Sequence, residues 1–285
     1  MKKDIIGKIA ACAVAFAAVG AARAEFKGET VNGYTWIYEE EGGESFIVGI
    51  TSNPSGTLTF PAELGGKPVR NLYGHSWVSF AKFQWQEADW YDEGGYWQRV
   101  WDVSDDWLSG VTGVVIPEGV TNICDRAFAS DDWTDDSTGE RYRFGWYNLK
   151  SVTIPDSLLS CNICLTSWDN AFYGTPFLRS KKFPDFILNK SGTKLWGVKA
   201  YEGEWDYDVC RDAVVPASVT EIADNALCTF GAYGKYEYGD GSEGYGLSVF
   251  GEGYVRIVFE GTKPKASKLT FAREKNAHIL FSKSR

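Results

Sequence analysis

Histidine is almost absent from this sequence of 285 residues, which holds only His75 and His278. The two lie far apart along the chain, whereas a histidine zinc site or a catalytic triad needs a histidine beside its partners. The sequence also lacks the G-x-S-x-G, H-E-x-x-H and P-loop motifs. Its many carboxylates could form a glycosidase pair, but no single acid is set apart from the others. We therefore expect no enzyme activity, no metal and no cofactor.

Basic residues are also in the minority, with 29 Lys and Arg against 38 Asp and Glu, which gives a formal charge of -9. A nucleic-acid-binding surface needs a basic face, so we expect no nucleic-acid partner. No segment reaches 18 uninterrupted apolar residues, so we expect no transmembrane segment. Because 44% of the residues are hydrophobic, the chain still holds enough apolar material for a folded core.

Residues 1–24 have the pattern of a secretory signal peptide. Lys2 and Lys3 give a positive start, an apolar stretch of 12 residues follows, and Ala22-Arg23-Ala24 is typical of a cleavage site. Ile9-Ala10-Ala11-Cys12 also resembles a lipobox, but the apolar stretch would then lie after the lipidated cysteine. We favour cleavage after Ala24 over lipidation, and we expect an exported protein.

Five cysteines would remain after that cleavage. An exported protein meets an oxidising compartment, so disulfides are allowed, but an odd number leaves at least one thiol free or paired between chains. Cys161 and Cys164 form a C-x-x-C motif without the strand-to-helix context of a redox motif or the second pair of a zinc site. We expect mainly buried, small apolar side chains, with one or two bridges among them, at Cys124, Cys161, Cys164, Cys210 and Cys228.

An apolar pattern recurs along the chain. Apolar residues follow Pro117 at offsets of 3, 6 and 11, and they follow Pro216 at the same offsets. A third copy around Pro155 carries six extra residues before Ala171-Phe172, and a looser copy begins at Leu58. Each copy has a short apolar strand that ends at a proline, which cannot donate a ladder hydrogen bond. One unit cannot bury its apolar residues alone, so we expect the units to stack around a common core.

The pattern V-x-I-P-x-x-V-x-x-I-x-x-x-A-F resembles the BspA-type leucine-rich repeats of exported and cell-surface bacterial proteins and of some protist surface proteins. The phrase N-A-F-Y-G-T-P-F at 170–177 is similar to one that often precedes a hairpin in this family, here expected from Phe186 to Val198. The resemblance touches most of residues 31–261. It implies a repeat solenoid of mainly short β-strands with short helical turns, located in the periplasm, on the cell surface or outside the cell. By family analogy it also implies adhesion or protein interaction.

The expected organisation has four parts. They are the signal peptide at 1–24, opening strands or a cap at 25–56, the leucine-rich-repeat solenoid at 57–261, and a C-terminal cap or tail at 262–285. Ile279-Leu280-Phe281 is a candidate last strand. Leucine-rich units usually recur every ~20–29 residues, whereas the prolines here are 38 to 61 residues apart. Each unit is therefore over-long, and insertions in repeats often project from the binding face.

The insertions, expected at 78–109, 131–147 and 230–247, are rich in aromatic and acidic residues. Rigid Trp and Tyr rings anchor protein interfaces. A sugar can also pack its C–H face on such a ring while nearby carboxylates accept hydrogen bonds from its hydroxyls. The candidate binding residues are Trp85, Trp90, Trp97, Trp101, Trp107, Trp133 and Trp146.

A structural interpretation of these rings stays open. A long insertion needs a small core of its own, and the spacings of 5, 7 and 4 between four tryptophans of 78–109 are partly helical, which favours packing for some of them. Calcium is another alternative, with Asp131-Asp132 and Asp135-Asp136, or Asp206 and Asp208, as oxygen ligands. Because no D-x-D-x-D-G loop appears, solvated loop charge accounts for these acids.

The sequence thus predicts an exported, non-enzymatic leucine-rich-repeat protein that mediates protein or surface interaction, or adhesion. Its ligand would be a protein or a glycan that binds to the aromatic, acidic insertions. The alternatives are a structural module of the cell envelope without a dedicated ligand, a glycan-binding protein, and an enzyme that acts on glycans.

Overall fold

In a computed structural model, the regular secondary structure of the described residues consists almost entirely of β-strands. The part that the structure describes contains one short 3-10 helix, η1 (Pro176–Leu178), and no α-helix. Residues 1–24, the expected signal peptide, lie outside this part. The described residues are 27–72, 81–87, 97–101, 108–134, 138–139, 141–165, 167, 169–203, 211–227, 231–237, 243–249, 255–262, 264–266 and 279–281.

An antiparallel meander opens the described chain, within the region expected for the N-terminal strands. Two-residue turns join β1 to β2 at Asn32-Gly33 and β2 to β3 at Gly42-Gly43. All four turn residues have positive φ, between 55° and 88°, which matches the twist of a tight hairpin. The strands are β1 (Lys27–Val31), β2 (Tyr34–Glu41) and β3 (Glu44–Ile50).

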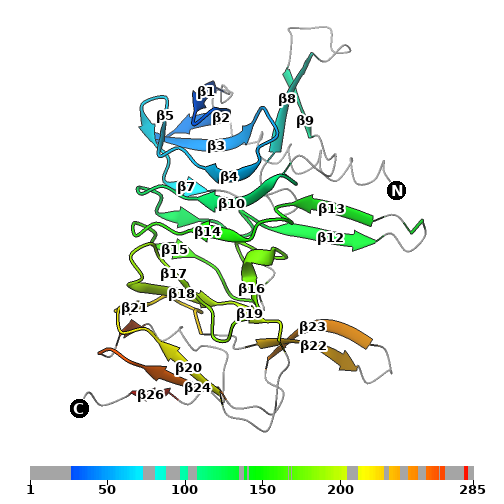
Figure 1. Ribbon diagram of the computed structural model, residues 1–285. Coiled ribbons are helices and arrows are strands. Elements are labelled where there is room, and N and C mark those ends of the chain that lie inside the picture. The colour runs from blue at the N-terminus through cyan, green and yellow to red at the C-terminus, as the bar shows by residue number, and fades with distance from the viewer. Residues whose placement is uncertain are drawn as a thin grey trace.

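Parallel strands from successive segments stack beneath this meander (Figure 1). They are β4 (Gly56–Thr59), β10 (Val111–Val115) and β14 (Ser151–Thr153), with β10 in the centre. Thr59 pairs with Val115, and Val115 with Thr153. The residues that follow, Phe60, Ile116 and Ile154, therefore share one level of the stack. A proline comes directly after each of them and ends the strand.

A second parallel ladder runs beside the first, formed by β7 (Asn71–Leu72), β11 (Asn122–Ile123) and β15 (Ser160–Cys161). The same backbone hydrogen bond recurs between its segments. The N–H of Thr121 donates to the carbonyl of Arg70 at 2.8 Å, and the N–H of Leu159 donates to the carbonyl of Thr121, also at 2.8 Å. The backbone of successive segments therefore has the same course at this point.

The lower half of the stack contains the hairpin that the sequence predicts between Phe186 and Val198, and the structure confirms it as β17 and β18. A parallel bridge from Asn189 to Ile154 joins this hairpin to the first ladder. Ile279–Phe281, the candidate last strand, is confirmed as β26. The strands are β17 (Phe186–Leu188), β18 (Lys194–Val198), β20 (Arg211–Val215), β21 (Glu221–Ile222), β24 (Val255–Phe259), β25 (Lys265–Ala266) and β26 (Ile279–Phe281). Parallel pairing joins β18 to β21 and β21 to β25, and likewise β20 to β24 and β24 to β26.

Shorter strands and three long hairpins complete the described fold. β5 pairs with β6, and β16 and β19 lead to β22 and β23 in one sheet. The long hairpins are β8–β9, β12–β13 and β22–β23. The bounds are β5 (Glu63–Leu64), β6 (Lys67–Pro68), β8 (Ala81–Glu87), β9 (Trp97–Trp101), β12 (Ser130–Thr134), β13 (Arg141–Gly145), β16 (Arg179–Ser180), β19 (Ala200–Tyr201), β22 (Gly231–Glu237) and β23 (Glu243–Val249).

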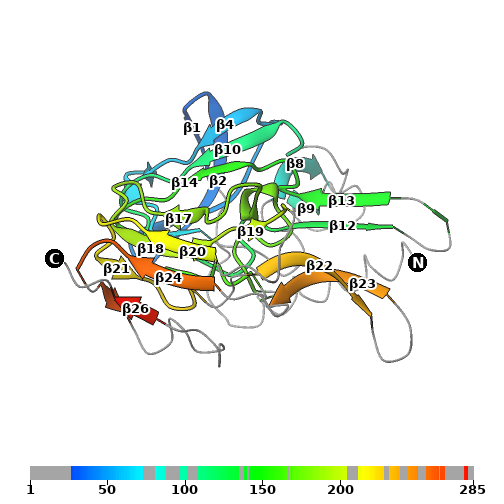
Figure 2. The ribbon, with the colours of Figure 1, turned by 60° about the horizontal axis from the view of Figure 1, so that its bottom comes forward.

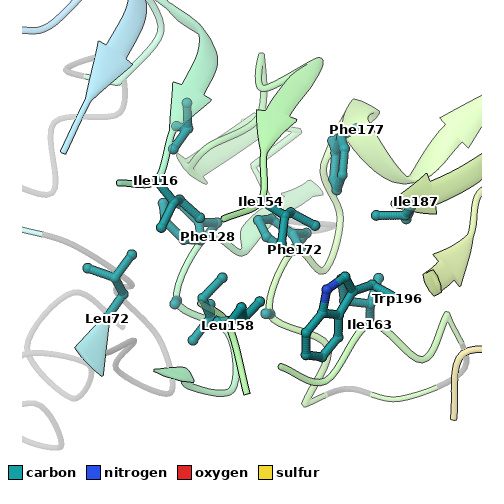
Figure 3. Packing of buried hydrophobic residues seen from close by; sticks show 14 of the residues in the cluster. Leu72, Ile116, Phe128, Ile154, Leu158, Ile163, Phe172, Phe177, Ile187 and Trp196 are labelled. Carbon is teal, nitrogen blue, oxygen red and sulfur yellow. The ribbon is translucent and has the colours of Figure 1, made fainter. Parts of the chain in front are cut away.

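Buried aromatic rings fill the interior of the stack. Phe128 stacks on Phe172 with 5.3 Å between ring centroids, and it meets Phe60 edge-on at 5.6 Å. Figure 3 shows the rings of Phe128 and Phe172 close to Ile116 and Ile154, the residues that directly follow β10 and β14. The interior is therefore continuous from one segment to the next, so burial of each segment depends on its neighbours.

The segments that carry Ala-Phe form single turns rather than longer helices. The N–H of Ala127 donates to the carbonyl of Cys124 at 3.2 Å, which closes one turn. Arg126 and Asn225 each stand nine residues after a proline, and their φ values are 58° and 60°. Two copies therefore share an uncommon left-handed conformation. In the described part, the short helical turns expected from the sequence are single turns of this kind and η1.

Carboxylates tie the turn of one segment to the turn of the next. The two oxygens of Glu118 accept the N–H groups of Asp156 and Ser157, both at 3.1 Å. Asp156 Oδ1 in turn accepts the N–H of Ser191 at 2.9 Å. These bonds satisfy amides in the turns, where strand pairing provides no acceptor.

A cluster of three charges joins the opening meander to β5–β6. Lys27 Nζ lies 2.9 Å from Glu40 Oε1, and Lys67 Nζ contacts the other carboxylate oxygen. The hydrogen bond from Lys67, followed by that from Lys27, lowers the pKa of the Glu40 carboxyl below its ordinary value. The two ammonium groups therefore stabilise the ionised form of Glu40 in the folded protein.

We expect the free energy of unfolding to depend on the ionisation of Glu40. Since folding lowers the pKa of this carboxyl, its contribution is fully present above the ordinary value of 4.5 and is lost as the pH falls through the lower folded-state value. In urea unfolding, the difference between wild type and Glu40→Gln should be constant above about pH 5 and shrink at lower pH. A difference that stays unchanged down to about pH 2 would contradict this linkage.

Candidate interaction surface

The three long hairpins leave the stack on the same side of the molecule. β12–β13 and β22–β23 extend to that side in both views, away from the ladders, and β8–β9 rises from it at the N-terminal end (Figures 1 and 2). Each hairpin lies in one of the insertions expected at 78–109, 131–147 and 230–247, or overlaps its ends by one or two residues. The strands of the three hairpins thus share one side of the described fold.

The register of β8–β9 places its aromatic residues on one face. Residues directly opposite each other in an antiparallel pair share a face, and the face alternates along each strand. Phe83 pairs with Trp101, Trp85 with Arg99, and Glu87 with Trp97, so these six positions share one face. The opposite face carries the pairs Gln84 with Val100 and Gln86 with Gln98.

The register of β12–β13 separates its residues in the same way. Trp133 pairs with Tyr142, and Asp131 pairs with Phe144, which puts three aromatic residues and one acid on one face. The other face holds the pairs Asp132 with Arg143 and Thr134 with Arg141, which are polar or charged.

The third hairpin, β22–β23, is less strictly divided. Tyr233 pairs with Leu247, and Lys235 pairs with Tyr245, on one face. Tyr236 belongs to the other face, where it pairs with Gly244. Aromatic positions are therefore concentrated on one face of two hairpins and spread over both faces of the third.

The predicted tryptophans have different positions in this arrangement. Trp85 lies in β8, Trp97 and Trp101 lie in β9, and Trp133 lies in β12. Trp90 and Trp107 fall outside the described residues. The helical interpretation of the tryptophan spacing is wrong for Trp85, Trp97 and Trp101, because these residues belong to two paired strands. Within each strand the period is two, as in Phe83-x-Trp85-x-Glu87.

Trp146 is a core residue and not part of a binding surface, which corrects its place among the candidates. Its side chain is 0% exposed, and its ring lies 5.1 Å from that of Phe128 and 6.4 Å from that of Phe60. A ring that is enclosed by the core offers no surface to a ligand. Trp146 directly follows β13, so it holds the base of the hairpin instead.

Backbone contacts hold the same base. The N–H of Ser130 donates to the carbonyl of Tyr173 at 2.7 Å, and the N–H of Trp146 donates to that of Ala129 at 3.3 Å. Gly145 has a φ of 75°, and a Cβ atom there would lie 2.3 Å from the carbonyl oxygen of Ala129. Only glycine fits this approach, so β12–β13 leaves the stack at a defined point.

Truncation of Trp146 should destabilise the fold. Trp146→Ala removes a fully buried ring from the aromatic interior, and we expect a loss of about 3–5 kcal/mol in the free energy of unfolding. Leu159→Ala is the control, because this side chain is 74% exposed, and we expect a change below about 0.5 kcal/mol. Urea unfolding measures both, and equal effects of the two substitutions would contradict the core assignment of Trp146.

Cysteines form a second cluster, at the second ladder. Cys124 and Cys161 are free thiols, Cys164 is buried, and Cys210 and Cys228 lie outside the described residues. Burial raises the pKa of the Cys161 thiol strongly, and the nearby Asp125 carboxylate adds to the effect. Burial also raises the pKa of Cys124, against a hydrogen bond from Asn122. Both thiols therefore stay protonated and poorly nucleophilic, unlike the thiolate of a catalytic cysteine.

Alkylation should be slow at these thiols in the folded protein. Because the thiolate is the reactive species and burial disfavours it, we expect Cys161 to react with iodoacetamide at about pH 8 at least about tenfold more slowly in the folded than in the urea-unfolded chain. Peptide mapping by mass spectrometry reads each cysteine separately. Labelling of Cys161 at the same rate in both states would show that the thiol is accessible and activated.

The described residues contain no group of three or more His, Cys, Asp or Glu side chains arranged to hold a metal ion. The calcium candidates Asp135, Asp136, Asp206 and Asp208 lie outside those residues. In the same part of the chain, no helix has the length and apolar character needed to cross a membrane. Comparison with protein-family models found no match, and neither did comparison with curated proteins or with solved structures.

Several residues on the same hairpin faces as the tryptophans were not predicted from the sequence. Phe83, Arg99 and Phe144 stand beside the predicted tryptophans in register, yet they were not among the candidates. The signal that indicates them is alternation with period two, in Trp97-x-Arg99-x-Trp101 and in Tyr142-x-Phe144.

Proposed function

We propose that this chain is an exported, non-enzymatic leucine-rich-repeat protein of the BspA type that binds a protein through its hairpin side. One observation carries the proposal. Three insertions, far apart in sequence, fold into hairpins on the same side of the stack, and two of them carry their aromatic residues on one register face.

The repeat class is supported by the two parallel ladders and by the shared interior. Leucine-rich repeats bury their apolar residues by stacking neighbouring units, and terminal units are covered by a different structure. Here Phe60, Ile116 and Ile154 share one level, and the antiparallel meander β1–β3 lies beyond the first parallel strand. Export is supported by the signal-peptide pattern of residues 1–24.

Protein binding is supported by the chemistry of the hairpins. Trp and Tyr contribute large contact areas with few rotatable bonds, so they dominate the energetics of many protein interfaces. A standard interface buries about 800 Å² on each partner, and three hairpins spread along the stack provide contacts over a wide area. Sites on a rigid scaffold also lose little conformational entropy on binding.

Substitution on the two faces of one hairpin tests the proposal. We would measure binding of the purified protein to arrays of extracellular-matrix proteins and glycans, and then compare Trp85→Ala/Trp101→Ala with Gln86→Ala/Gln98→Ala. All four residues lie in β8 and β9, but the register puts the two pairs on opposite faces. We expect the tryptophan variant to lose at least about tenfold in affinity for a bound protein, and the glutamine variant to keep it.

Circular dichroism must show both variants folded. Equal affinities of wild type and both variants would show that the aromatic face is not part of the binding site. The absence of binding to any matrix protein would favour the structural module of the cell envelope, and binding to glycans alone would make the protein a glycan-binding one.

A further inference from the structure

One described stretch of this acidic chain is positively charged. Residues 179–202, all of which the structure describes, hold six basic and two acidic residues and so carry a net charge of +4. Both acids lie close to a base of the same stretch. Arg179 Nη1 lies 3.8 Å from Glu202 Oε1, and Lys199 Nζ lies 3.1 Å from Asp185 Oδ2. The acids of the stretch therefore balance only two of its six positive charges.

Two exposed lysines contribute to the remaining charge. Lys181 and Lys182 directly follow β16, and no ion pair joins them to an acid within the described part of the chain. The N–H of Lys182 donates to Ser180 Oγ at 3.1 Å, so the backbone of the loop is held at this point. The next residue is the half-buried Phe183, whose ring meets that of Tyr201 edge-on at 5.7 Å. The lysines thus directly precede an aromatic pair.

This stretch begins between two of the long hairpins (Figures 1 and 2). On one side, β16 and β19 belong to the sheet that continues into β22–β23. On the other side, η1 directly precedes β16 and is joined to the turn that follows β13, because the N–H of Phe177 donates to the carbonyl of Leu149 at 2.8 Å. The start of the basic stretch is therefore connected to the bases of β12–β13 and β22–β23.

One face of β12–β13 is turned toward the segment that leads to this stretch. Ser130 Oγ would lie 2.9 Å from a Cβ atom at Gly174, so the hairpin face that contains Ser130 looks toward the next segment. Alternation along the paired strands places Arg141 and Arg143 on this face, together with one acid, Asp132. The face therefore adds basic positions on the same side as the lysines.

We propose that Arg141, Arg143, Lys181 and Lys182 form a basic surface that binds an acidic segment of the protein partner, one with clustered Asp and Glu side chains. This inference rests on the proposed function and specifies the chemistry of the ligand. Arginine holds a carboxylate through two parallel hydrogen bonds, and lysine attracts it as a compact charge. Opposite charge also speeds association and selects the partner.

Binding of simple acidic peptides tests the inference. The probes are an immobilised peptide of alternating Glu and Gly, its counterpart with Gln in place of Glu, and a sulfated oligosaccharide. Biolayer interferometry with the purified full chain measures their affinities at about 50 and about 300 mM NaCl. We expect the glutamate peptide to bind most tightly and to lose at least about tenfold in affinity at the higher salt concentration.

Two matched variants locate the charge that matters. Lys181→Ala/Lys182→Ala removes two bases of the basic surface, and Lys190→Ala/Lys265→Ala removes two exposed bases elsewhere. Lys190 belongs to the same stretch but borders the first ladder, where its N–H donates to the carbonyl of Ile154 at 2.8 Å. Both variants change the net charge by two. We expect at least about a threefold loss of affinity for the glutamate peptide in the first variant and none in the second.

The hairpin part of the basic surface is tested in the same way. Arg141→Gln/Arg143→Gln removes its two bases, and we expect a further loss of at least about threefold. Circular dichroism must show all three variants folded. An unchanged affinity in the folded arginine variant would show that β12–β13 is not part of the site and would overturn the basic surface as defined.

Four other results would overturn the inference: equal losses in the two lysine variants, affinity that does not change with salt, equal binding of the glutamine peptide, or tighter binding of the sulfated oligosaccharide. A matrix protein that needs Trp85 and Trp101 but not Lys181 and Lys182 would overturn the acidic ligand and leave the proposed function standing. A matrix protein that needs both pairs, together with binding of the glutamate peptide that falls in Lys181→Ala/Lys182→Ala, would support both.

Discussion

Parallel pairing between Thr59, Val115 and Thr153 sets the register on which the stack depends. It brings Phe60, Ile116 and Ile154 to one level, next to the stacked rings of Phe128 and Phe172. A slip of one residue in any strand would turn its apolar side chains away from this interior. The prolines help to exclude such a slip, because each one removes a donor at the point where its strand must end.

The ladders and the hairpins differ in the residues that they carry. The ladders bury apolar residues, and some charges beside them are paired at close range, as Lys194 is with Glu221 and Lys199 with Asp185. The hairpins lie outside the two parallel ladders and carry many of the aromatic residues. Because Trp146 and the backbone contacts of Ser130 hold the base of β12–β13, the exposed end of this hairpin can vary in sequence at little cost to the core.

Burial at matching offsets after Pro117 and Pro216 could be predicted from the sequence, because the apolar residues at offsets of 3, 6 and 11 from each proline all lie in the core. The hairpin from Phe186 to Val198 was predicted as well. The conformation of the insertions was not, because the tryptophan spacing runs from β8 to β9, two paired antiparallel strands, and this makes it look partly helical. Trp146 was misassigned for another reason: composition does not distinguish the base of an insertion from its tip, and only the packing against Phe128 does.

The turn carboxylates have a consequence for how such a chain can change in length. Glu118 accepts amides from the following segment, and Asp156 repeats this one segment later. Each segment therefore carries a carboxylate that accepts N–H groups of the next segment, and N–H groups that donate to the carboxylate of the segment before it. Removal of a whole segment would set Glu118 opposite the amide of Ser191 and recreate the junction. Removal of half a segment would leave a carboxylate without its amide donors. We therefore expect duplication and loss to involve whole segments.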